Sequence, residues 1–325
     1  MKNINVLITG ITGQDGIFLT NELLNNKNVN IYGTSRKYNK HLFVSKLNYL
    51  NKNIDFDRIN IINSNLLLEE EVFGILNKIK PDYIYHMSGP SSVYDSLTNT
   101  ELSKQIILIF DNLITSCIKL NIFPNFFQSS SSEMFGKNTK TMLDEKSEFI
   151  PNSPYGDSKA LIHHKISSIR KEYKWSLASG IMFNHESEFR QDDYLFMKII
   201  NYAMDINKQN SQLTLGSLEL KRDWSYAKDI ANAAVLINQS NCNSDYVLGS
   251  GKSKQIKYVA NKIFQYFDLD YKDYVKVNEN LLRSGDPLER ISNPNKIKKD
   301  LNWEAKTSIS EIINKIIKYK LSIRN

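Results

Sequence analysis

Residues 5–16, NVLITGITGQDG, decide the fold, because an apolar run ends in three closely spaced glycines. The run Asn5–Thr9 predicts a buried strand, and the residues from Gln14 onward predict a helix. Glycines between a strand and a helix permit a tight turn and let a dinucleotide pyrophosphate approach the helix N-terminus. A glycine-rich turn without a ligand is the alternative. The residues predicted to bind a cofactor here are Gly10, Thr12, Gly13, Gln14, Asp15 and Gly16.

The first half of the chain continues this alternation of short apolar runs and longer helical patterns. Further strands are predicted at residues 30–33, 60–63, 82–87, 125–129 and 176–183, and helices at 14–25, 69–80, 101–120 and 155–173. Regular β-α-β alternation with apolar strands indicates a parallel sheet covered by helices on both faces. The predicted fold class is therefore α/β, a doubly wound parallel sheet of the Rossmann type.

The pattern becomes less regular in the second half, where helices are predicted near residues 195–207, 228–239, 255–267 and 309–321. This change indicates a boundary between a dinucleotide-binding domain, residues 1–183, and a smaller C-terminal domain for the substrate, residues 184–325. Residues 225–250 are expected to return to the first domain. The chain has no internal repeat and no low-complexity linker, so the two parts are expected to pack closely.

Composition and charge narrow the function classes. The 325 residues include 42 Lys and Arg against 35 Asp and Glu, a net charge of +7 that fits a solvated surface or a phosphorylated ligand, and nucleic-acid binding is not expected. The cysteines, Cys117 and Cys242, form no CxxC pair and have no histidine at zinc-ligand spacing, so neither a disulfide nor a metal site is expected. The N-terminus lacks a signal-peptide pattern, and no apolar run approaches the roughly 18 residues of a membrane span. The expected location is the cytoplasm, away from the membrane.

Two basic residues follow the second predicted strand and indicate the cofactor. A site for NAD usually has an acidic residue here to hold the ribose hydroxyls. This chain has Arg36 and Lys37 instead, and cationic side chains suit the 2′-phosphate of NADP. A solvated basic turn is the alternative, but the position favours NADP.

Tyr155 and Lys159 form a YxxxK pattern, and their spacing places them one turn apart on the same helix face. A lysine ammonium near a phenol favours the phenolate, so the pattern predicts a lowered tyrosine pKa. Tyr155 could then remove the proton of a hydroxyl group while a nicotinamide takes hydride from the same carbon. The pattern is common by chance on surface helices, but here it follows a serine-rich strand end and a loop that contains two prolines.

The serine-rich strand end, Gln128–Gly136, has the sequence QSSSSEMFG. A serine such as Ser131 can orient a reacting hydroxyl and share its proton. Glu133 is the informative residue, because a carboxylate in a partly buried cleft can exchange a proton with a carbon next to a ketone. A helix-capping or solvated glutamate is the alternative for a lone Glu, but the position beside the serines favours catalysis.

These motifs, taken in chain order, resemble the GDP-mannose 4,6-dehydratase family of extended short-chain dehydrogenases. The GxxGxxG spacing is itself typical of short-chain dehydrogenases. The segments that carry the resemblance are ITGITGQDGIFLTNELL, SSSSEMFG, SPYGDSKA, IMFNHES and LGSLELKRDWSYAKD, and the likeness extends to Asn293–Trp303. Related sugar epimerases and reductases share the glycine motif and YxxxK but usually lack the glutamate at position 133.

The resemblance implies catalytic roles for the central residues. Glu133 would be the acid–base residue at carbon 5 and at the leaving hydroxyl on carbon 6. Tyr155 would be the base at the carbon 4 hydroxyl, with Lys159 as its partner. Ser131 stands where the family usually has threonine.

The resemblance also implies binding residues for both ligands. The further residues implied to bind the cofactor are Asn65, Leu66, Tyr155, Lys159 and His185. The residues implied to hold the GDP-sugar are Ser91, Asn184, Lys198, Arg222 and Arg283.

Three departures from the family pattern leave questions open. Asn65-Leu66 replaces a usual Asp-Leu pair, although asparagine can still bond to adenine. The paired arginines that make a tetramer contact in relatives appear here as Glu188-Phe189-Arg190, with one arginine left, so a homodimer and a homotetramer are both expected possibilities. Ser92 lies in the segment that faces the sugar and stands where the family commonly has histidine, which leaves the hexose open.

The implied activity is a GDP-sugar 4,6-dehydratase that converts GDP-mannose to GDP-4-keto-6-deoxymannose by internal hydride transfer through bound NADP. Another GDP-sugar, such as GDP-N-acetylglucosamine or a GDP-heptose, is an alternative substrate. A nucleotide-sugar epimerase or reductase would keep Tyr155 and Lys159 but make no use of Glu133. A non-enzymatic cofactor-binding protein is the third alternative, and the intact catalytic set argues against it.

Overall fold

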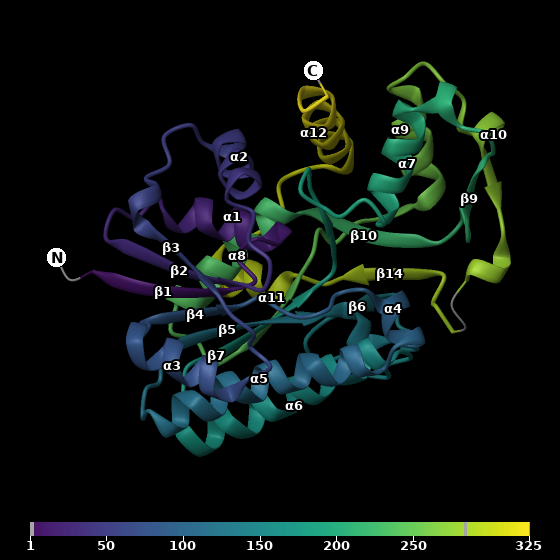
Figure 1. Ribbon diagram of the computed structural model, residues 1–325. Coiled ribbons are helices and arrows are strands. Elements are labelled where there is room, and N and C mark those ends of the chain that lie inside the picture. The colour runs from purple at the N-terminus through teal and green to yellow at the C-terminus, as the bar shows by residue number, and fades with distance from the viewer. Residues whose placement is uncertain (1–2, 283–284, 325) are drawn as a thin grey trace.

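The larger of the sheets contains seven parallel strands in the order β11-β7-β5-β4-β1-β2-β3 (Figure 1). The computed structural model describes residues 3–282 and 285–324. The strands of this sheet are β1 (Ile4–Thr9), β2 (Val29–Ser35), β3 (Ile59–Asn63), β4 (Tyr83–His86), β5 (Asn125–Ser131), β7 (Leu177–Met182) and β11 (Asp245–Leu248). All neighbouring pairs are parallel, which confirms the predicted fold class.

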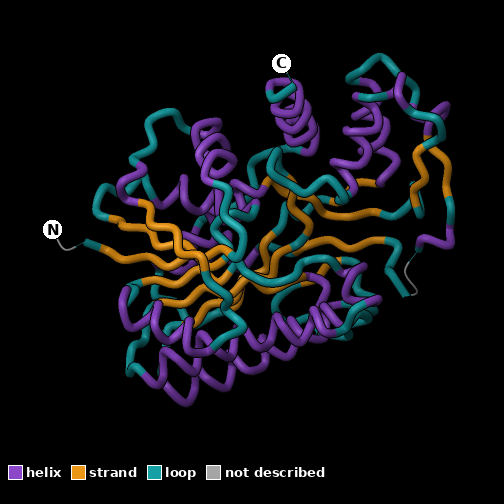
Figure 2. The backbone as a smooth tube through the Cα atoms, in the orientation of Figure 1, coloured by secondary structure: helices purple, strands orange, loops and turns teal. Residues whose placement is uncertain are grey.

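Helices cover both faces of this sheet, as Figure 2 shows. One face is covered by α1 (Gln14–Leu23), α2 (Lys40–Leu50) and α8 (Ala227–Gln239), and the other by α3 (Glu69–Ile79), α5 (Glu101–Lys119) and α6 (Pro154–Tyr173). The side chains of a strand alternate between its faces. Val6 and Ile8 accordingly belong to the core under α1 and α8, whereas Leu7 belongs to the core under α5 and α6. Burial of both strand faces explains the continuous apolar runs of the sequence.

The topology places a crevice between β1 and β4. From β1 the chain adds β2 and β3 on one side, then crosses back to add β4 on the other side. Ligands of doubly wound sheets bind at such a switch point, outside the carboxyl ends of the strands. The chain leaves these ends at Thr9 and His86.

A smaller part of the molecule stands beyond the carboxyl edge of the large sheet (Figure 1). Its main sheet consists of β12 (Ser253–Gln255), β10 (Lys221–Tyr226), β14 (Glu289–Ser292) and β6 (Met142–Leu143), with β8 (Asn184–Glu186) paired to β10. A second ladder joins β9 (Leu213–Leu215) to β13 (Val275–Val277). The other helices are α4 (Val93–Thr98), α7 (Leu195–Met204), α9 (Ile256–Gln265), α10 (Tyr271–Tyr274), α11 (Asn295–Leu301) and α12 (Ile309–Ser322), with 3₁₀ turns η1 (Phe56–Arg58), η2 (Ser132–Phe135), η3 (Ile206–Lys208) and η4 (Glu279–Leu281).

One hydrophobic core runs through both parts. Phe196 of α7 and Trp224 of β10 belong to the same buried cluster as Val6 of β1. The chain crosses between the parts several times, because β8 follows β7 directly and α8 and β11 follow β10. The division of the chain at residues 183 and 184 into two domains stays a prediction.

The structure adds elements that the sequence patterns did not indicate. Helices α2 and α4 lie in segments for which no element was predicted, and β5 extends to Ser131 instead of ending at Ser129. Within residues 3–282 and 285–324, each helix is too short or too polar to cross a bilayer. The same residues contain no group of three His, Cys, Asp or Glu side chains arranged to hold a metal ion.

Candidate active site

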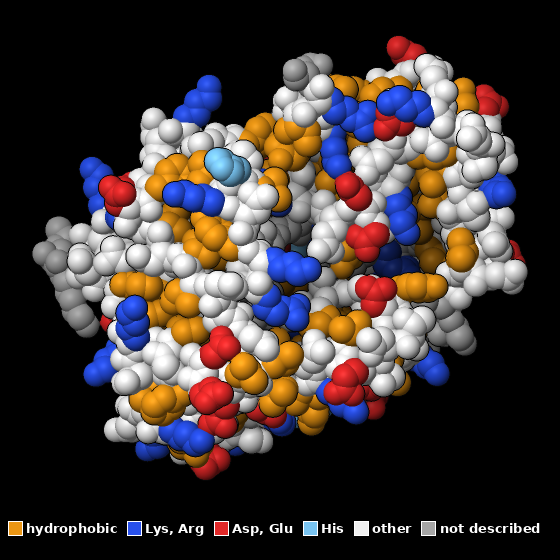
Figure 3. All heavy atoms as spheres, viewed as in Figure 1, with side chains coloured by type: hydrophobic (Ala, Val, Ile, Leu, Met, Phe, Trp, Pro, Cys, Tyr) orange, Lys and Arg blue, Asp and Glu red, His pale blue; other side chains and the backbone are white. Residues whose placement is uncertain are grey.

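A cleft of about 750 Å³ lies at the carboxyl edge of the large sheet, between the two parts of the molecule. In the space-filling view this face is hollowed between the parts, and basic and acidic side chains border the hollow (Figure 3). The volume lies in the range of small-molecule sites. The predicted site residues that line the cleft are Asp15, Ser91, Ser131, Glu133, Tyr155, Lys159, Asn184, His185, Lys198 and Arg222. Arg283 lies outside the described residues.

The glycine-rich turn has the shape that a cofactor pyrophosphate requires. Gly10 has a φ of +72°, and a Cβ there would lie 3.0 Å from the Cα of Ser88 on the neighbouring crossover. A Cβ at Gly16 would lie 2.5 Å from the carbonyl oxygen of Ile11. The N-cap of α1 is Gly13, which offers no side-chain cap to the first N–H groups of the helix. Uncapped N–H groups at a helix N-terminus are a site for phosphate.

His185 connects this turn to the smaller sheet. Its Nε2 lies 3.1 Å from Oδ1 of Asp15, and its Nδ1 lies 2.8 Å from the carbonyl oxygen of Phe183. Burial lowers the pKa of His185, but the Asp15 carboxylate outweighs burial and leaves that pKa above its usual value. Burial raises the pKa of Asp15, and its basic neighbours His185 and Arg190 bring it below its usual value. The two side chains form a mostly buried hydrogen bond between β8 and α1, and the raised pKa of His185 favours its protonated form beside the carboxylate.

The residues predicted to hold the adenosine part lie at the ends of β2 and β3. Arg36 and Lys37 are exposed and directly follow Ser35, whose Oγ lies 3.0 Å from Thr12 Oγ1 in the glycine-rich turn. The side-chain oxygen of Asn65 accepts the N–H of Leu67 at 3.3 Å and so closes the turn after β3. Leu66 is buried, and its carbonyl oxygen accepts Nδ2 of Asn112 at 2.9 Å.

The residues predicted to be catalytic meet where β5, η2 and α6 join. Ser131 ends β5 and caps η2, because its Oγ accepts the N–H of Glu133 at 3.2 Å. Helix α6 starts at Pro154, and Ser153 caps it by accepting the N–H of Gly156 at 3.1 Å. A Cβ at Gly156 would lie 2.7 Å from the carbonyl oxygen of Glu133. Gly156 therefore lets α6 begin against η2, which brings Tyr155 beside Ser131 and Glu133 in the cleft.

The electrostatics of Tyr155 differ from the prediction. Burial raises its pKa above the usual value, the Glu133 charge adds to the increase, and a hydrogen bond with Ser131 opposes it. Lys159 Nζ lies 5.7 Å from the centroid of the phenol ring and donates to the carbonyl oxygen of Ser129 at 2.8 Å. The predicted lowering of the tyrosine pKa by Lys159 is therefore wrong for this structure, because desolvation of the phenol dominates. Burial also lowers the pKa of Lys159 to about 8.

The side chains predicted to bind the GDP-sugar come from the smaller part. Asn184 begins β8, Lys198 lies on α7, and Arg222 lies on β10. The guanidinium of Arg222 is largely buried, donates to the carbonyl oxygen of Pro287 at 3.0 Å and pairs with Asp286 at 2.9 Å. All three residues line the same cleft as Ser131, Glu133, Tyr155 and Lys159.

Comparison with known proteins identifies the family. The model described as GDP-mannose 4,6 dehydratase matches residues 7–316. The chain belongs to the GDP-mannose 4,6-dehydratase family. It is 29% identical to the GDP-mannose 4,6 dehydratase of Dictyostelium discoideum, with 96% of this chain and 94% of that protein covered. The human GDP-mannose 4,6 dehydratase is 27% identical, with 96% and 90% covered. The predicted resemblance is therefore confirmed.

Solved structures support the fold. The UDP-glucose 4-epimerase of Thermotoga maritima, solved with UDP-glucose, is similar with a TM-score of 0.85 at 20% identity, and 99% of this chain and 100% of that chain are covered. The dTDP-glucose 4,6-dehydratase of Bacillus anthracis, solved in complex with NAD, gives a TM-score of 0.83 at 16% identity, with 98% and 97% covered. At these identities the likeness establishes the fold alone.

Phe189 and Arg190 lie in different surroundings, one in the hydrophobic core and the other in the cleft. Members of the GDP-mannose 4,6-dehydratase family usually have paired arginines at these positions. The ring of Phe189 packs 5.3 Å from that of Phe18 in the core. The Arg190 guanidinium lies 3.5 Å from the ring centroid of Tyr194, and the hydroxyl of Tyr194 lies 3.0 Å from Ser91 Oγ. Arg190, Tyr194 and Ser91 all line the cleft. Arg190 thus contributes to the cleft of its own chain, a placement that the sequence pattern did not reveal.

Arg290 is a second residue near the cleft that the sequence patterns did not indicate. It contacts Glu133. Its side chain is almost fully buried on β14, and its Nη1 lies 3.1 Å from Oε1 of Glu133. Residues 289–292 were not predicted to form a strand, so no periodicity marked position 290 as inward-facing. The alternation of half-buried and buried residues along β14 shows why this arginine points inward.

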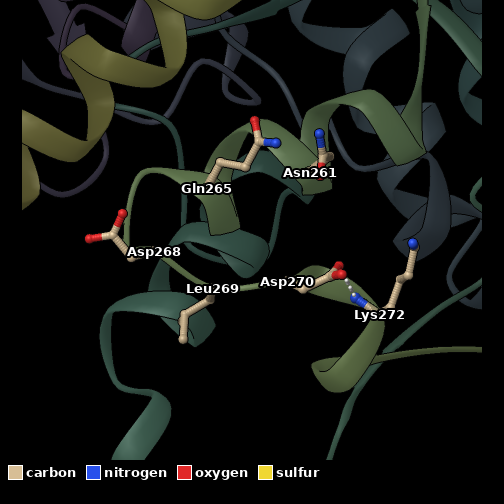
Figure 4. A pocket seen from close by; sticks show the side chains of 6 residues that line it. All are labelled: Asn261, Gln265, Asp268, Leu269, Asp270 and Lys272. Atoms are coloured by element: carbon tan, nitrogen blue, oxygen red, sulfur yellow. Dashed lines mark hydrogen bonds between the residues drawn. The ribbon is translucent and has the colours of Figure 1, made fainter.

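A smaller hollow of about 380 Å³ lies beside α9 and α10 (Figure 4). It is lined by Asn261, Gln265, Asp268, Leu269, Asp270 and Lys272. None of these residues belongs to the predicted site. One of its carboxylates, that of Asp270, caps α10 by accepting the backbone N–H of Lys272 at 3.1 Å.

Proposed function

We propose that this chain converts GDP-mannose to GDP-4-keto-6-deoxymannose by an internal 4,6-dehydration with bound NADP. The observation that carries the proposal is the meeting of Ser131, Glu133, Tyr155 and Lys159 in one cleft at the switch point of the sheet. Membership of the GDP-mannose 4,6-dehydratase family supports the same activity. The oligomeric state and the cellular compartment stay predictions.

The glycine-rich turn fits a dinucleotide. A Cβ at Gly10 or Gly16 would crowd the backbone of Ser88 or Ile11, so the turn requires glycine at both positions. Helix α1 also presents N–H groups that no side chain caps. Arg36 and Lys37 stand exposed at the end of β2, where they would meet a ribose 2′-phosphate and so favour NADP over NAD. The Bacillus anthracis dehydratase was solved in complex with NAD, so the preference proposed for this chain rests on its own basic side chains after β2.

The reaction assigns a separate task to each catalytic side chain. Bound nicotinamide would supply the acceptor for hydride from carbon 4 and later the donor to carbon 6. Tyr155 accepts the proton of the carbon 4 hydroxyl, while Ser131 orients that hydroxyl. The ketone at carbon 4 acidifies carbon 5, and Glu133 removes the proton there. Glu133 then protonates the carbon 6 hydroxyl, which departs as water, and carbon 5 regains a proton after carbon 6 is reduced.

Lys159 acts on Tyr155 through charge and position. Its ammonium lies against the face of the phenol and is held by the carbonyl oxygen of Ser129. A buried phenolate needs a nearby cation, because burial alone disfavours the charged form. The lysine pKa of about 8 keeps a large part of this group protonated at neutral pH. Lys159 would therefore favour the phenolate, which is the form of Tyr155 that can accept the proton of the carbon 4 hydroxyl.

The identity of the hexose rests on the segment before α4. Gly89, Pro90 and Ser92 line the cleft, and Ser92 replaces the histidine that the family commonly has at this position. A smaller side chain leaves more room beside the sugar ring, so a bulkier GDP-sugar, GDP-N-acetylglucosamine or a GDP-heptose, is the second candidate substrate. The GDP part would be held by Lys198 and Arg222 with either sugar.

The test is to incubate the purified chain with GDP-mannose and follow the mass of the sugar nucleotide. We expect loss of one water and an alkali-sensitive 4-keto absorbance, without added or consumed cofactor. A panel of GDP-, CDP-, UDP- and dTDP-hexoses run beside it defines the substrate class. An epimerase would leave the mass unchanged, a reductase would consume reduced cofactor, and a binding protein would change nothing. Each of these outcomes contradicts the proposal.

A further inference from the structure

Arg290 holds the carboxylate of Glu133 from inside the protein. Its Nη1 lies 3.1 Å from Oε1 of Glu133, and its Nη2 donates to the carbonyl oxygen of Gly136 at 2.9 Å. The exposed fraction is 3% for the Arg290 side chain and 12% for that of Glu133. The guanidinium therefore contacts both the side chain of Glu133 and the backbone of Gly136, at the end of η2.

The position of Arg290 is itself fixed by the smaller sheet. Arg290 pairs with Arg222 in the ladder between β14 and β10, and the next residue, Ile291, pairs with Met142 of β6. Asp286 lies between the two arginines, 2.9 Å from Arg222 and 3.9 Å from Arg290. A chain of charged groups thus runs from Glu133 to the arginine proposed to hold the GDP-sugar.

Glu133 needs such a support because its own backbone gives it little. It lies on η2, a four-residue 3₁₀ turn, and short 3₁₀ segments have poor hydrogen-bond geometry. A buried carboxylate also requires a partner of opposite charge. A guanidinium is planar, permanently charged and able to hold two acceptors in a fixed orientation.

We propose that Arg290 is a positioning residue that aims the Glu133 carboxylate at carbon 5 and carbon 6 of the sugar. The inference rests on the proposed function, since it assigns a role in the dehydration step. Arg290 is not among the residues that line the cleft, so we expect it to act through Glu133 and not by contact with the sugar. Oxidation at carbon 4 depends on Tyr155 and does not need this support.

The experiment compares Arg290→Leu and Arg290→Lys with the wild-type enzyme on GDP-mannose. Water loss and deuterium exchange at carbon 5 report on Glu133, and reduced cofactor formed in a single turnover reports on oxidation at carbon 4. For Arg290→Leu we expect water loss and exchange to fall about 10- to 100-fold, the size of loss that follows displacement of a reacting group by roughly 1 Å. Oxidation at carbon 4 should change much less.

Arg290→Lys serves as a rescue and guards against a fold defect. Lysine keeps the charge, but a single ammonium cannot reproduce the fork that reaches both Glu133 and Gly136. We expect the same selective loss in smaller degree. If Arg290→Leu does not fold, Arg290→Lys carries the comparison of the two steps, and a loss of both steps in equal proportion would contradict the proposal.

Arg170→Leu is the matched control. Arg170 also contacts a carboxylate and a carbonyl oxygen from a mostly buried position, with Nη2 2.6 Å from Asp245 and Nε 2.6 Å from the oxygen of Leu177. Removing it tests the general cost of losing such an arginine. It should lower Tm without separating the two steps. Equal selectivity in Arg170→Leu and Arg290→Leu would show that the effect is general.

A double-mutant cycle with Glu133→Gln completes the test. If Arg290 acts through Glu133, Arg290→Leu should slow dehydration little further once Glu133 is an amide. Independent, additive losses would overturn the positioning role. If the wild-type enzyme and Arg290→Leu remove water at the same rate, the positioning role of Arg290 is refuted and the proposed function stands. A wild-type enzyme that removes no water from any GDP-sugar refutes the proposed function.

Discussion

The two walls of the cleft are built in different ways. The cofactor wall, the side proposed for the cofactor, comes from the large sheet and includes the glycine-rich turn, whose Asp15 lines the cleft. The shape of this turn depends on its backbone, because Gly10 has a positive φ and Gly16 makes a contact that admits no Cβ. The substrate wall, the side proposed for the GDP-sugar, comes from the smaller part and depends on charged side chains. Arg222 lines the cleft, Arg290 lies outside the lining, and both pair with Asp286. One wall is a preformed backbone cradle, and the other is a network of buried charges.

This difference affects how each wall responds to change. A backbone cradle tolerates surface substitution but fails when a side chain is forced into it. A charge network can fail when any one partner is removed, because the remaining charge is left buried. Substitutions on the cofactor wall should therefore act on binding of the nucleotide cofactor. Those on the substrate wall should act on binding of the GDP-sugar or, at Arg290, on the step that Glu133 performs.

The largest effect is expected where the walls meet, at Tyr155. Tyr155→Phe removes the hydroxyl that takes the carbon 4 proton and should lower turnover about 10²- to 10⁴-fold, the usual contribution of a general base. The ring and its contact with Lys159 remain, so the cofactor should stay bound. Turnover and the nucleotide released on denaturation are the two measurements. A variant that keeps most of its turnover would remove Tyr155 from the mechanism.

A single added methyl group should break the cofactor wall. In Gly16→Ala the new Cβ would stand 2.5 Å from the carbonyl oxygen of Ile11, so the turn must shift. We expect a stability loss of roughly 1–3 kcal/mol, the cost of overpacking, and a clear loss of bound nucleotide. Thermal unfolding and nucleotide content measure the two effects.

Gly74→Ala is the matched control for this prediction. Gly74 lies exposed within α3, and a Cβ there meets no atom within 4 Å. Alanine should stabilise the helix by about 0.5–1 kcal/mol and leave the nucleotide content unchanged. If Gly16→Ala bound nucleotide as well as Gly74→Ala does, the backbone of this turn would not form the cofactor wall.

The contrast between the walls also explains how much the sequence could predict. Gly10, Gly13 and Gly16 act through local backbone shape, so their spacing was sufficient to predict the strand, the turn and the helix. Tyr155 and Lys159 share one helix face for the same local reason. Contiguous motifs of this kind predicted six of the seven strands of the large sheet, but not β11. The catalytic roles of the residues in these motifs stay predictions.

The substrate wall depends on contacts between distant residues. Arg290 reaches Glu133 across 157 positions of the chain, and Tyr194 meets Ser91 across 103. Neither pair has a local spacing that a sequence pattern could reveal. The pKa of Tyr155 was predicted in the wrong direction for a related reason, because the neighbour Lys159 is visible in the sequence and the depth of burial is not.

A smaller effect is expected at the outer end of the cofactor wall. Arg36→Ala should weaken NADP binding about 10-fold, within the range for losing a charge-assisted contact to phosphate, and should leave NAD binding unchanged. NAD affinity of the same variant is the internal control, because NAD lacks the 2′-phosphate. The nucleotide released from the wild-type protein provides a second check. Recovery of mainly NAD, with equal affinities in Arg36→Ala, would refute the preference for NADP.

The smallest effect concerns the sugar, and it tests whether the substrate wall selects the hexose. Ser92 lines the cleft and caps α4, where its Oγ accepts the N–H of Asp95 at 3.1 Å. Ser92→His adds bulk beside the sugar and removes this cap. Ser92→Ala removes the cap alone and is the matched control, with an expected stability cost of about 1 kcal/mol in both variants.

The measurement is kcat/KM for GDP-mannose and for GDP-N-acetylglucosamine. If Ser92 leaves room for a larger substituent, Ser92→His should lower the efficiency on the bulkier sugar relative to GDP-mannose by about 10-fold, as expected for steric discrimination of one small group. Ser92→Ala should leave that ratio unchanged, since an empty space by itself selects no ligand. A strong preference for GDP-mannose that Ser92→His does not alter would show that position 92 leaves the choice of hexose to other residues, and that GDP-mannose is the substrate of this cleft.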